Sequence, residues 1–297
     1  MSKVPNYFHF VFGLKKQTSP FHLMHYLCLK SCIAVNRPDT VYFYYDHEPY
    51  GYYWELIKPF LTLERINIET LNSDISYKDE TLCKYKYAHI ADFVRLEKLV
   101  ERGGVYADID TIFVRPMPQH FFGKEFILGR EPDIVNERGE IKTSLCNAWI
   151  SSSKGSDFGR LWLSKMPEHF NGSWSNHSTV LPAELGVDFP ELIHIEPQSS
   201  FYDFIWSKEG IADLFERNVN VGKNVYSIHL WAHLWWDRSR KDFSRFHQGR
   251  LNHAYVNRAS TTYAALAKPF LPEKKFQLLP ERFLALKEMA KRLTRIS

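Results

Sequence analysis

Apolar and aromatic residues in the first half of the chain follow two spacings, one typical of buried strands and the other of helices. β-branched and aromatic runs at 7–12 and 41–45 predict two strands, and 65–71 predicts a third. Apolar residues at helical spacing predict helices over 20–35 and 51–61. Strands that alternate with helices favour an α/β fold with a parallel or mostly parallel sheet.

The alternation continues with a long helix and a strand in the middle of the chain. Apolar and aromatic residues recur at helical spacing over 82–102, and the pattern stops at Gly103-Gly104, a common way to end a helix. A β-rich run over 105–114 follows and ends before Arg115-Pro116. A helix, a double glycine and a buried strand are therefore expected in direct succession.

The second half of the chain carries weaker patterns. They predict short strands over 125–129 and 148–151, with a polar loop over 131–144 between them. They also predict helical patches over 157–166 and 208–217 and a late strand over 225–231. No linker divides the chain cleanly. We predict one catalytic domain over 1–240 and a C-terminal extension over 241–297.

The end of the chain has a character of its own. From about 280 to 296, apolar residues fall on one helical face and basic residues occupy the remainder, which predicts a basic amphipathic helix. Two interpretations stay open: the helix docks on the domain with its basic face in solvent, or it contacts an anionic membrane surface. The excess of cations over acids favours the second, as peripheral contact at the inner face of a membrane.

Composition narrows the class of protein. The chain has 297 residues and a formal net charge of only +4, so its charge does not call for nucleic acid. Neither a signal peptide nor an apolar run long enough to span a bilayer is visible, and we expect a cytoplasmic protein. The cysteines lack metal-binding spacing, and Cys28 and Cys32 are expected to be small core residues.

The strongest chemical signal is Asp108-Ile109-Asp110 at the end of the predicted buried strand. Two carboxylates two residues apart project from the same side of a strand. Such a pair near a hydrophobic core needs a cation, and Mg²⁺ or Mn²⁺ carrying a phosphate ligand suits hard oxygen donors. The alternative is a solvated turn or helix cap, which is the ordinary environment of an isolated Asp-x-Asp.

The segment 87–110 resembles the sugar-binding region of Asp-x-Asp glycosyltransferases. The nearest group is the family-32-like set, which includes yeast-type mannosyltransferases and α-1,4-galactosyltransferase-like proteins, with the clostridial glucosylating toxins as distant relatives. Four further segments resemble family elements, although Asp203 replaces the usual proline: 4–13, 147–150, 201–206 and 228–231. The likeness covers roughly residues 1–240.

The resemblance implies a Rossmann-like nucleotide-diphospho-sugar transferase fold and a retaining reaction. It implies that Asp110 binds the metal directly and that Asp108 is shared between metal and ribose. His229 is the third candidate ligand, with a structural histidine as the alternative. No residue is assigned as a nucleophile, because a retaining transferase can use front-side attack through an oxocarbenium-like state. No residue is assigned as a base, because the leaving phosphate itself can take the acceptor proton.

The resemblance also implies a donor site. Phe12 would stack on the base, Asp92 and Arg95 would bind sugar hydroxyls or the diphosphate, Asn147 would lie near the donor sugar, and Trp231 would pack beside the phosphate. Plainer interpretations are a core aromatic for Phe12 and an intrahelical ion pair for Asp92 and Arg95. Four tryptophans would suit a cleft for the acceptor sugar: Trp149, Trp231, Trp235 and Trp236. The plainer interpretation is that several of them are core residues.

The expected function is therefore a metal-dependent hexosyltransferase. A UDP-sugar is the favoured donor of a hexose or N-acetylhexosamine. The acceptor would be a saccharide of a surface polysaccharide or glycolipid, as in lipopolysaccharide or capsule biosynthesis. Two alternatives are a metal-dependent phosphohydrolase, which needs further ligands at other strand ends, and a catalytically degenerate saccharide-binding module.

Overall fold

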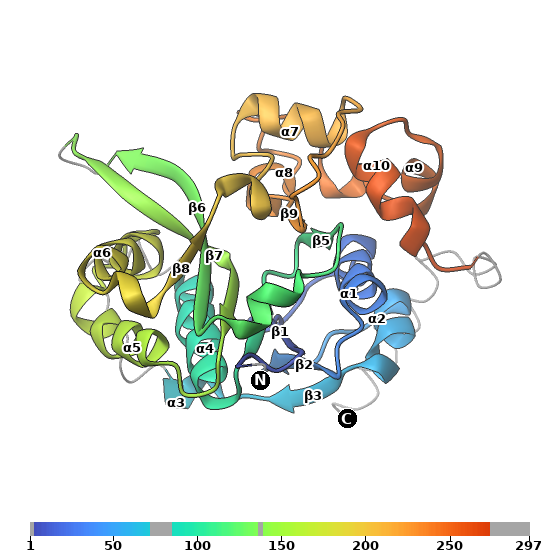
Figure 1. Cartoon of the computed structure of the whole chain (residues 1–297). Helices are drawn as coiled ribbons and strands as arrows, with labels where there is room; N and C mark the ends of the chain where they lie inside the picture. Colours follow the sequence, from blue (N-terminus) through green and yellow to red (C-terminus); the bar gives the residue numbers. More distant parts are fainter. Residues whose placement is uncertain (1–2, 72–84, 136–138, 274–297) are drawn as a thin grey trace.

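A seven-stranded sheet organises the chain, with strand order β3-β2-β1-β4-β7-β6-β8 (Figure 1). The computed structural model describes residues 3–71, 85–135 and 139–273. The strands are β1 Tyr7–Val11, β2 Thr40–Tyr45, β3 Thr62–Arg65, β4 Gly104–Ala107, β6 Phe126–Val135, β7 Ile141–Ser152 and β8 His194–Glu196. Only β7 runs antiparallel to its neighbours β4 and β6. The predicted α/β class with a mostly parallel sheet is confirmed.

Helices cover both faces of this sheet (Figure 1). Their bounds are α1 Leu23–Asn36, α2 Tyr52–Ile57, α3 Ile68–Leu71, α4 Lys86–Arg102, α5 Asp157–His169, α6 Leu181–Asp188, α7 Lys208–Phe215, α8 Ala232–Trp235, α9 His253–Arg258 and α10 Thr262–Ala267. Because successive strand residues point to opposite faces, Phe43 and Val105 pack with α1 and α2, whereas Tyr44 and Tyr106 pack with α4. The helices predicted over 20–35, 51–61, 157–166 and 208–217 are confirmed, as is that over 82–102 from Lys86 onward.

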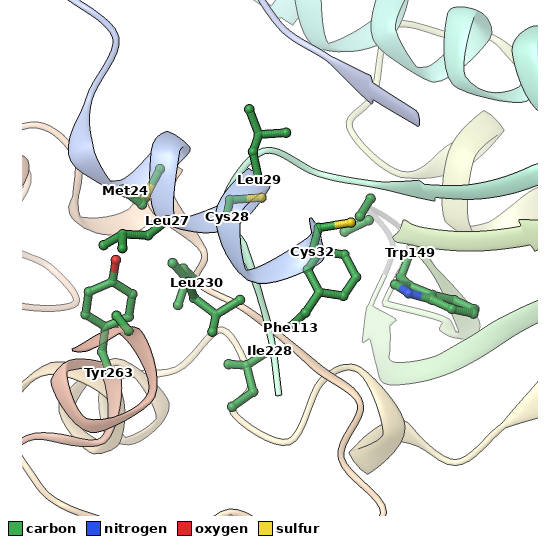
Figure 2. Close-up of a cluster of buried hydrophobic side chains, with 14 of the residues drawn as sticks. Met24, Leu27, Cys28, Leu29, Cys32, Phe113, Trp149, Ile228, Leu230 and Tyr263 are labelled. Atoms are coloured by element: carbon green, nitrogen blue, oxygen red, sulfur yellow. The ribbon is translucent and has the colours of Figure 1, made fainter. Parts of the chain in front are cut away.

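A second, two-stranded sheet lies beside α1. Its strands β5 (Thr111–Phe113) and β9 (Ser227–His229) are antiparallel. Figure 2 shows Cys28 and Cys32 of α1 in one cluster with Phe113 of β5 and Ile228 of β9. Both cysteines are free and fully buried, which confirms that they are core residues.

The helices after residue 240 share this core. Tyr263 of α10 is fully buried and appears in Figure 2 beside the α1 side chains, and Phe246 and Leu251 belong to the same cluster. The division at residue 240 stays a prediction. The predicted basic helix at 280–296 lies outside the described residues. In the part of the chain that is described, no helix has the length and apolarity to cross a membrane.

In exposed parts of the chain, two predicted elements were wrong. The third strand ends at Arg65, and 68–71 is helical because the Asn67 side chain accepts a hydrogen bond from the backbone N–H of Glu69, which starts a turn. The predicted polar loop at 131–144 is an extension of β6 and β7 into a hairpin, with Val135 paired to Ile141. Both of these residues are exposed, so the hairpin lacks the apolar alternation of a half-buried strand.

Candidate active site

The turn from Asp108 to Asp110 joins the two sheets. The predicted single strand over 105–114 is in fact β4 and β5, separated by this turn. The Asp108 N–H donates to the Ala148 carbonyl at 2.9 Å, and the Asp110 carbonyl accepts from Leu230 N at 2.9 Å. Hydrogen bonds to β7 on one side and to the segment after β9 on the other therefore hold the two carboxylates in place.

His229 of β9 completes a three-residue cluster with these carboxylates. Its Nε2 lies 3.1 Å from Asp110 Oδ1 and 3.6 Å from Asp108 Oδ2. One ligand atom from each residue lies within 4.8 Å of the others, and no other such group of three occurs in the described residues. The two carboxylates fit Mn²⁺ or Mg²⁺, which prefer oxygen donors and take remaining ligands from phosphate and water, and the imidazole adds one nitrogen donor.

Burial and charge set the protonation of this cluster. Burial acts to lower the pKa of His229, but Asp110 and Asp108 outweigh it and raise this pKa to about 10. Burial acts in the opposite direction on both carboxylates. Arg95 and His229 nevertheless hold the pKa of Asp108 below its usual value, and His229 does the same for Asp110. Without a metal, the protonated imidazole balances the carboxylates; a bound cation would replace that proton.

Asp92 and Arg95 of α4 form the ion pair expected from their spacing, at 2.8 Å between Oδ1 and Nη2. Asp92 Oδ1 also accepts from Asn147 Nδ2 at 3.2 Å, and Oδ2 lies 2.9 Å from His177 Nε2. Arg95 Nη1 donates to the Asn147 carbonyl at 2.6 Å and lies 3.5 Å from Asp108 Oδ1. The pair therefore connects α4 to β7 and to the carboxylate turn.

One cavity of about 610 Å³ brings most of the predicted site residues together. Such a volume suits a small-molecule ligand. Its lining includes Asp92, Arg95, Asp108, Asp110, Asn147, His229 and Trp231. Phe12 does not line it: its ring packs on His25 at a centroid distance of 4.6 Å, and Val11 and His25 face the cavity. The roles of all these residues stay predictions.

The four tryptophans divide into core and cavity residues. Trp149 is buried and stacks on Phe201 at 3.8 Å, and Trp235 is fully buried. Trp231 and Trp236 line the cavity. Trp231 adopts a left-handed backbone conformation (φ 53°) that is unusual for a bulky residue, and its indole N–H donates to the Phe204 carbonyl at 2.7 Å.

Three cavity and network residues stand outside every segment that resembles a family element, namely Glu131, Trp174 and His177, whereas Tyr202 lies within one such segment, 201–206. Glu131 stands in the segment predicted as a loop, and Trp174 lies between α5 and the π-helical turn Asn176–Val180. Tyr202 contacts β7 through its hydroxyl, which accepts from Ala148 N at 3.3 Å. His177 is fully buried and reaches Asp92 from the same π-helical turn. For Glu131, Trp174 and His177, only the tertiary packing shows that they belong to the site.

Comparison with known proteins agrees with this geometry. Residues 21–128, which contain Asp92, Arg95, Asp108 and Asp110, match the family described as "Glycosyltransferase sugar-binding region containing DXD motif". Over this region the chain is similar to glycosyltransferases that carry the DXD motif. The match extends from α1 to the start of β6 and so includes the carboxylate turn.

A curated relative extends the similarity. The chain is 30% identical over 241 residues to "Glucan organizing enzyme 1" of Cryptococcus neoformans var. grubii, covering 78% of this chain and 63% of that protein. The chain thus spans less than two thirds of the relative's length.

Solved structures show remoter similarity. The PaToxG glycosyltransferase is 18% identical with a TM-score of 0.43, over 63% of this chain and 70% of that one. Mouse xyloside xylosyltransferase 1 is 12% identical with a TM-score of 0.46, over 75% of this chain and 96% of that one.

Proposed function

We propose that this chain is a metal-dependent, retaining glycosyltransferase. It would move a hexose or N-acetylhexosamine from a nucleotide-sugar, preferably a UDP-sugar, to a saccharide acceptor of a surface polysaccharide or glycolipid. The observation that carries the proposal is the convergence of Asp108, Asp110 and His229 in one cavity, next to the Asp92–Arg95 pair of the matched family region. When a nucleotide-sugar transfers its sugar, the nucleoside diphosphate departs with negative charge. The cation site and Arg95 lie close enough together to stabilise that charge.

In this proposal, Asp108, Asp110 and His229 hold Mn²⁺ or Mg²⁺, with Asp110 the principal ligand. When bound, the cation would stabilise negative charge on the departing diphosphate. Arg95 adds a fixed positive charge beside Asp108, because the buried guanidinium is held by Asp92 and the Asn147 carbonyl. Asp92, held by Arg95, Asn147 and His177, would accept hydrogen bonds from sugar hydroxyls.

The acceptor assignment rests on a relative's name and on the aromatic lining of the cavity. The relative's name connects it with glucan organisation, which favours a saccharide acceptor for this chain too. Cavity-lining Trp231 and Trp236 offer aromatic surfaces to the apolar faces of sugars. A cytoplasmic location and contact of the predicted basic helix with an anionic membrane complete the proposal.

A phosphohydrolase would use the same carboxylates differently. It would need additional metal ligands at neighbouring strand ends, and the described residues contain no second cluster of this kind. A degenerate saccharide-binding module would bind sugars without metal dependence.

A panel of UDP- and GDP-sugars, incubated with the full chain and Mn²⁺, tests the proposal. We expect slow hydrolysis of one donor, lost on chelation with EDTA and restored by Mn²⁺. Absence of both hydrolysis and metal-dependent binding for every donor would reject the proposed function. Hydrolysis of simple phosphate esters at a comparable rate would favour the phosphohydrolase instead.

A further inference from the structure

A second hollow lies directly beside the reaction cavity. It has a volume of about 480 Å³ and is bounded by the β6–β7 hairpin on one side and the segment 171–180 on the other. Ile134, Trp174 and Ser175 line both this hollow and the reaction cavity. In Figure 1 the hairpin extends beyond the sheet next to α6, which forms part of the same wall through Glu184. The two spaces therefore share a border.

Trp174 presents an aromatic surface at this border. Its side chain is 48% exposed, although the ring packs edge-on against Tyr85 at 5.3 Å and tilted against His233 at 5.7 Å. His233 itself lines the reaction cavity. An exposed tryptophan of this kind offers a flat apolar surface with a polar edge, and one face of a sugar ring presents C–H groups that match it.

The second hollow is polar in a balanced way. Lys142 and Glu184 contribute opposite charges 3.7 Å apart, and Asn171, Ser173 and Asn176 contribute amide and hydroxyl groups. Because the charges offset one another, the lining does not select a strongly charged ligand. Donors and acceptors of both kinds suit a neutral ligand rich in hydroxyl groups.

Glu131 is the corresponding polar group on the reaction-cavity side. Its Oε1 accepts a hydrogen bond from the Ser144 hydroxyl. Its Oε2 has no hydrogen-bond partner in the described part of the chain, and the residue lines the reaction cavity. A carboxylate oxygen in this position can accept hydrogen bonds from a sugar hydroxyl.

We propose that the acceptor is a neutral oligosaccharide that occupies both spaces. Its terminal sugar binds in the reaction cavity beside Glu131, and the preceding units cross Trp174 into the hollow between Lys142 and Asn171, which we call the acceptor groove. The assignment of this ligand as an acceptor rests on the proposed function. The binding itself does not, because it requires neither donor nor metal.

Binding of oligosaccharides by chain length tests this proposal. Gluco-, manno- and galacto-oligosaccharides of one to six units are titrated into the full chain without donor or metal, with binding followed by saturation-transfer NMR and calorimetry. We expect at least one series in which chains of three or more units bind about tenfold or more tightly than the monosaccharide, since one sugar cannot reach both spaces. Failure of every longer chain to bind, or equal binding of all lengths, would overturn the proposal.

Variants test whether the gain in affinity with oligosaccharide length depends on the acceptor groove. Trp174→Ala is expected to remove most of the gain from chain length, and Trp174→Phe to retain part of it. Phe60→Ala, which removes another exposed aromatic ring (55% exposed), serves as the matched control and should bind like the unmodified chain. If Trp174→Ala does not fold, Glu184→Ala tests the far end of the groove, and here too the gain should fall. An unchanged gain in the folded variant would contradict the groove.

The outcome is separable from that of the proposed function. If the protein hydrolyses a UDP-sugar with Mn²⁺ but its oligosaccharide affinity does not depend on length, the proposed function stands and the acceptor groove is rejected. If the protein binds oligosaccharides through Trp174 but cleaves no donor, the groove stands as a saccharide-binding site and the transferase assignment is rejected.

Discussion

His229 Nε2 lies 3.1 Å from Asp110 Oδ1, and the antiparallel pairing of Thr111 with His229 fixes this approach. The candidate metal cluster is therefore built where the small β5–β9 sheet meets the turn that follows β4 of the main sheet. Asp110 is also held from the other side, because its Oδ2 accepts a hydrogen bond from Ala232 N at 2.8 Å. β5 and β9 are distant in sequence, and their pairing is short. A shift in the register of either strand would separate Asp110 from His229.

Gly104 positions the carboxylate turn and should not tolerate a side chain. Its φ is +113°, and a Cβ would lie 2.6 Å from the Tyr7 carbonyl oxygen. We expect Gly104→Ala to lower the free energy of unfolding by about 1–3 kcal/mol or more in urea titrations. Gly123→Ala is the control, because no atom lies within 4 Å of its Cβ position, and its effect should stay within about 0.5 kcal/mol. Equal stability of the two variants would show that β4 can shift to accommodate the methyl group.

Asp92 balances a buried cation, so its removal should destabilise the fold. Asp92→Ala leaves the Arg95 guanidinium without its nearest carboxylate and His177 without its partner, and we expect a loss of about 3–5 kcal/mol. Asp157→Ala breaks an exposed pair with Arg160 and should cost no more than about 1 kcal/mol. Chemical denaturation measures both. Similar values for the two would mean that water or Asp108 compensates Arg95 fully.

The pattern of residues predicted the centre of the fold well and its edges poorly. β1 and β4 are buried on both faces, so a run such as Tyr7–Val11 is apolar or aromatic at every position except His9 and is easily recognised. The Gly103-Gly104 end of α4 is also confirmed, with both glycines at positive φ. The β6–β7 hairpin escaped recognition because it extends into solvent, where neither face selects apolar residues.

The candidate site was predictable only in part, for a related reason. Asp108, Asp110 and His229 stand in short motifs that resemble known elements, and the structure brings them together as that resemblance implied. Glu131 enters the cavity through the register of a hairpin that the sequence did not reveal. His177 reaches Asp92 through a π-helical turn without a recognisable motif.

Glu131 should give stability a characteristic pH dependence. Burial raises its pKa to about 7, although the Ser144 hydroxyl acts in the opposite direction. Between an unfolded-state pKa of about 4.3 and this value, the folded chain holds more protons than the unfolded chain, so the free energy of unfolding falls as pH rises. Glu131→Gln should make the decrease between about pH 5 and about pH 8 smaller in urea titrations. Identical pH profiles for the variant and the unmodified chain would place the Glu131 pKa near its ordinary value.

Metal binding should tighten as pH rises, because the cation competes with the His229 proton. With the pKa of His229 raised to about 10, Mn²⁺ binding near neutral pH releases this proton. We expect the affinity to increase up to about tenfold per pH unit between about pH 6.5 and about pH 8.5, measured by calorimetry in buffers of different ionisation enthalpy. His229→Gln should bind Mn²⁺ more weakly and with a flatter pH profile. A flat profile in the unmodified chain would remove His229 from the ligand set.

The most direct test of the central claim is a Mn²⁺ titration of the full chain in the presence of UDP, comparing the unmodified chain with Asp110→Asn. The account predicts one Mn²⁺ per unmodified chain and an affinity about 100-fold weaker in Asp110→Asn, with its circular dichroism and thermal unfolding retained. Asp157→Asn, a change to an exposed carboxylate, should bind like the unmodified chain. Equal Mn²⁺ affinity in Asp110→Asn and the unmodified chain would contradict the assignment of a metal to Asp108, Asp110 and His229.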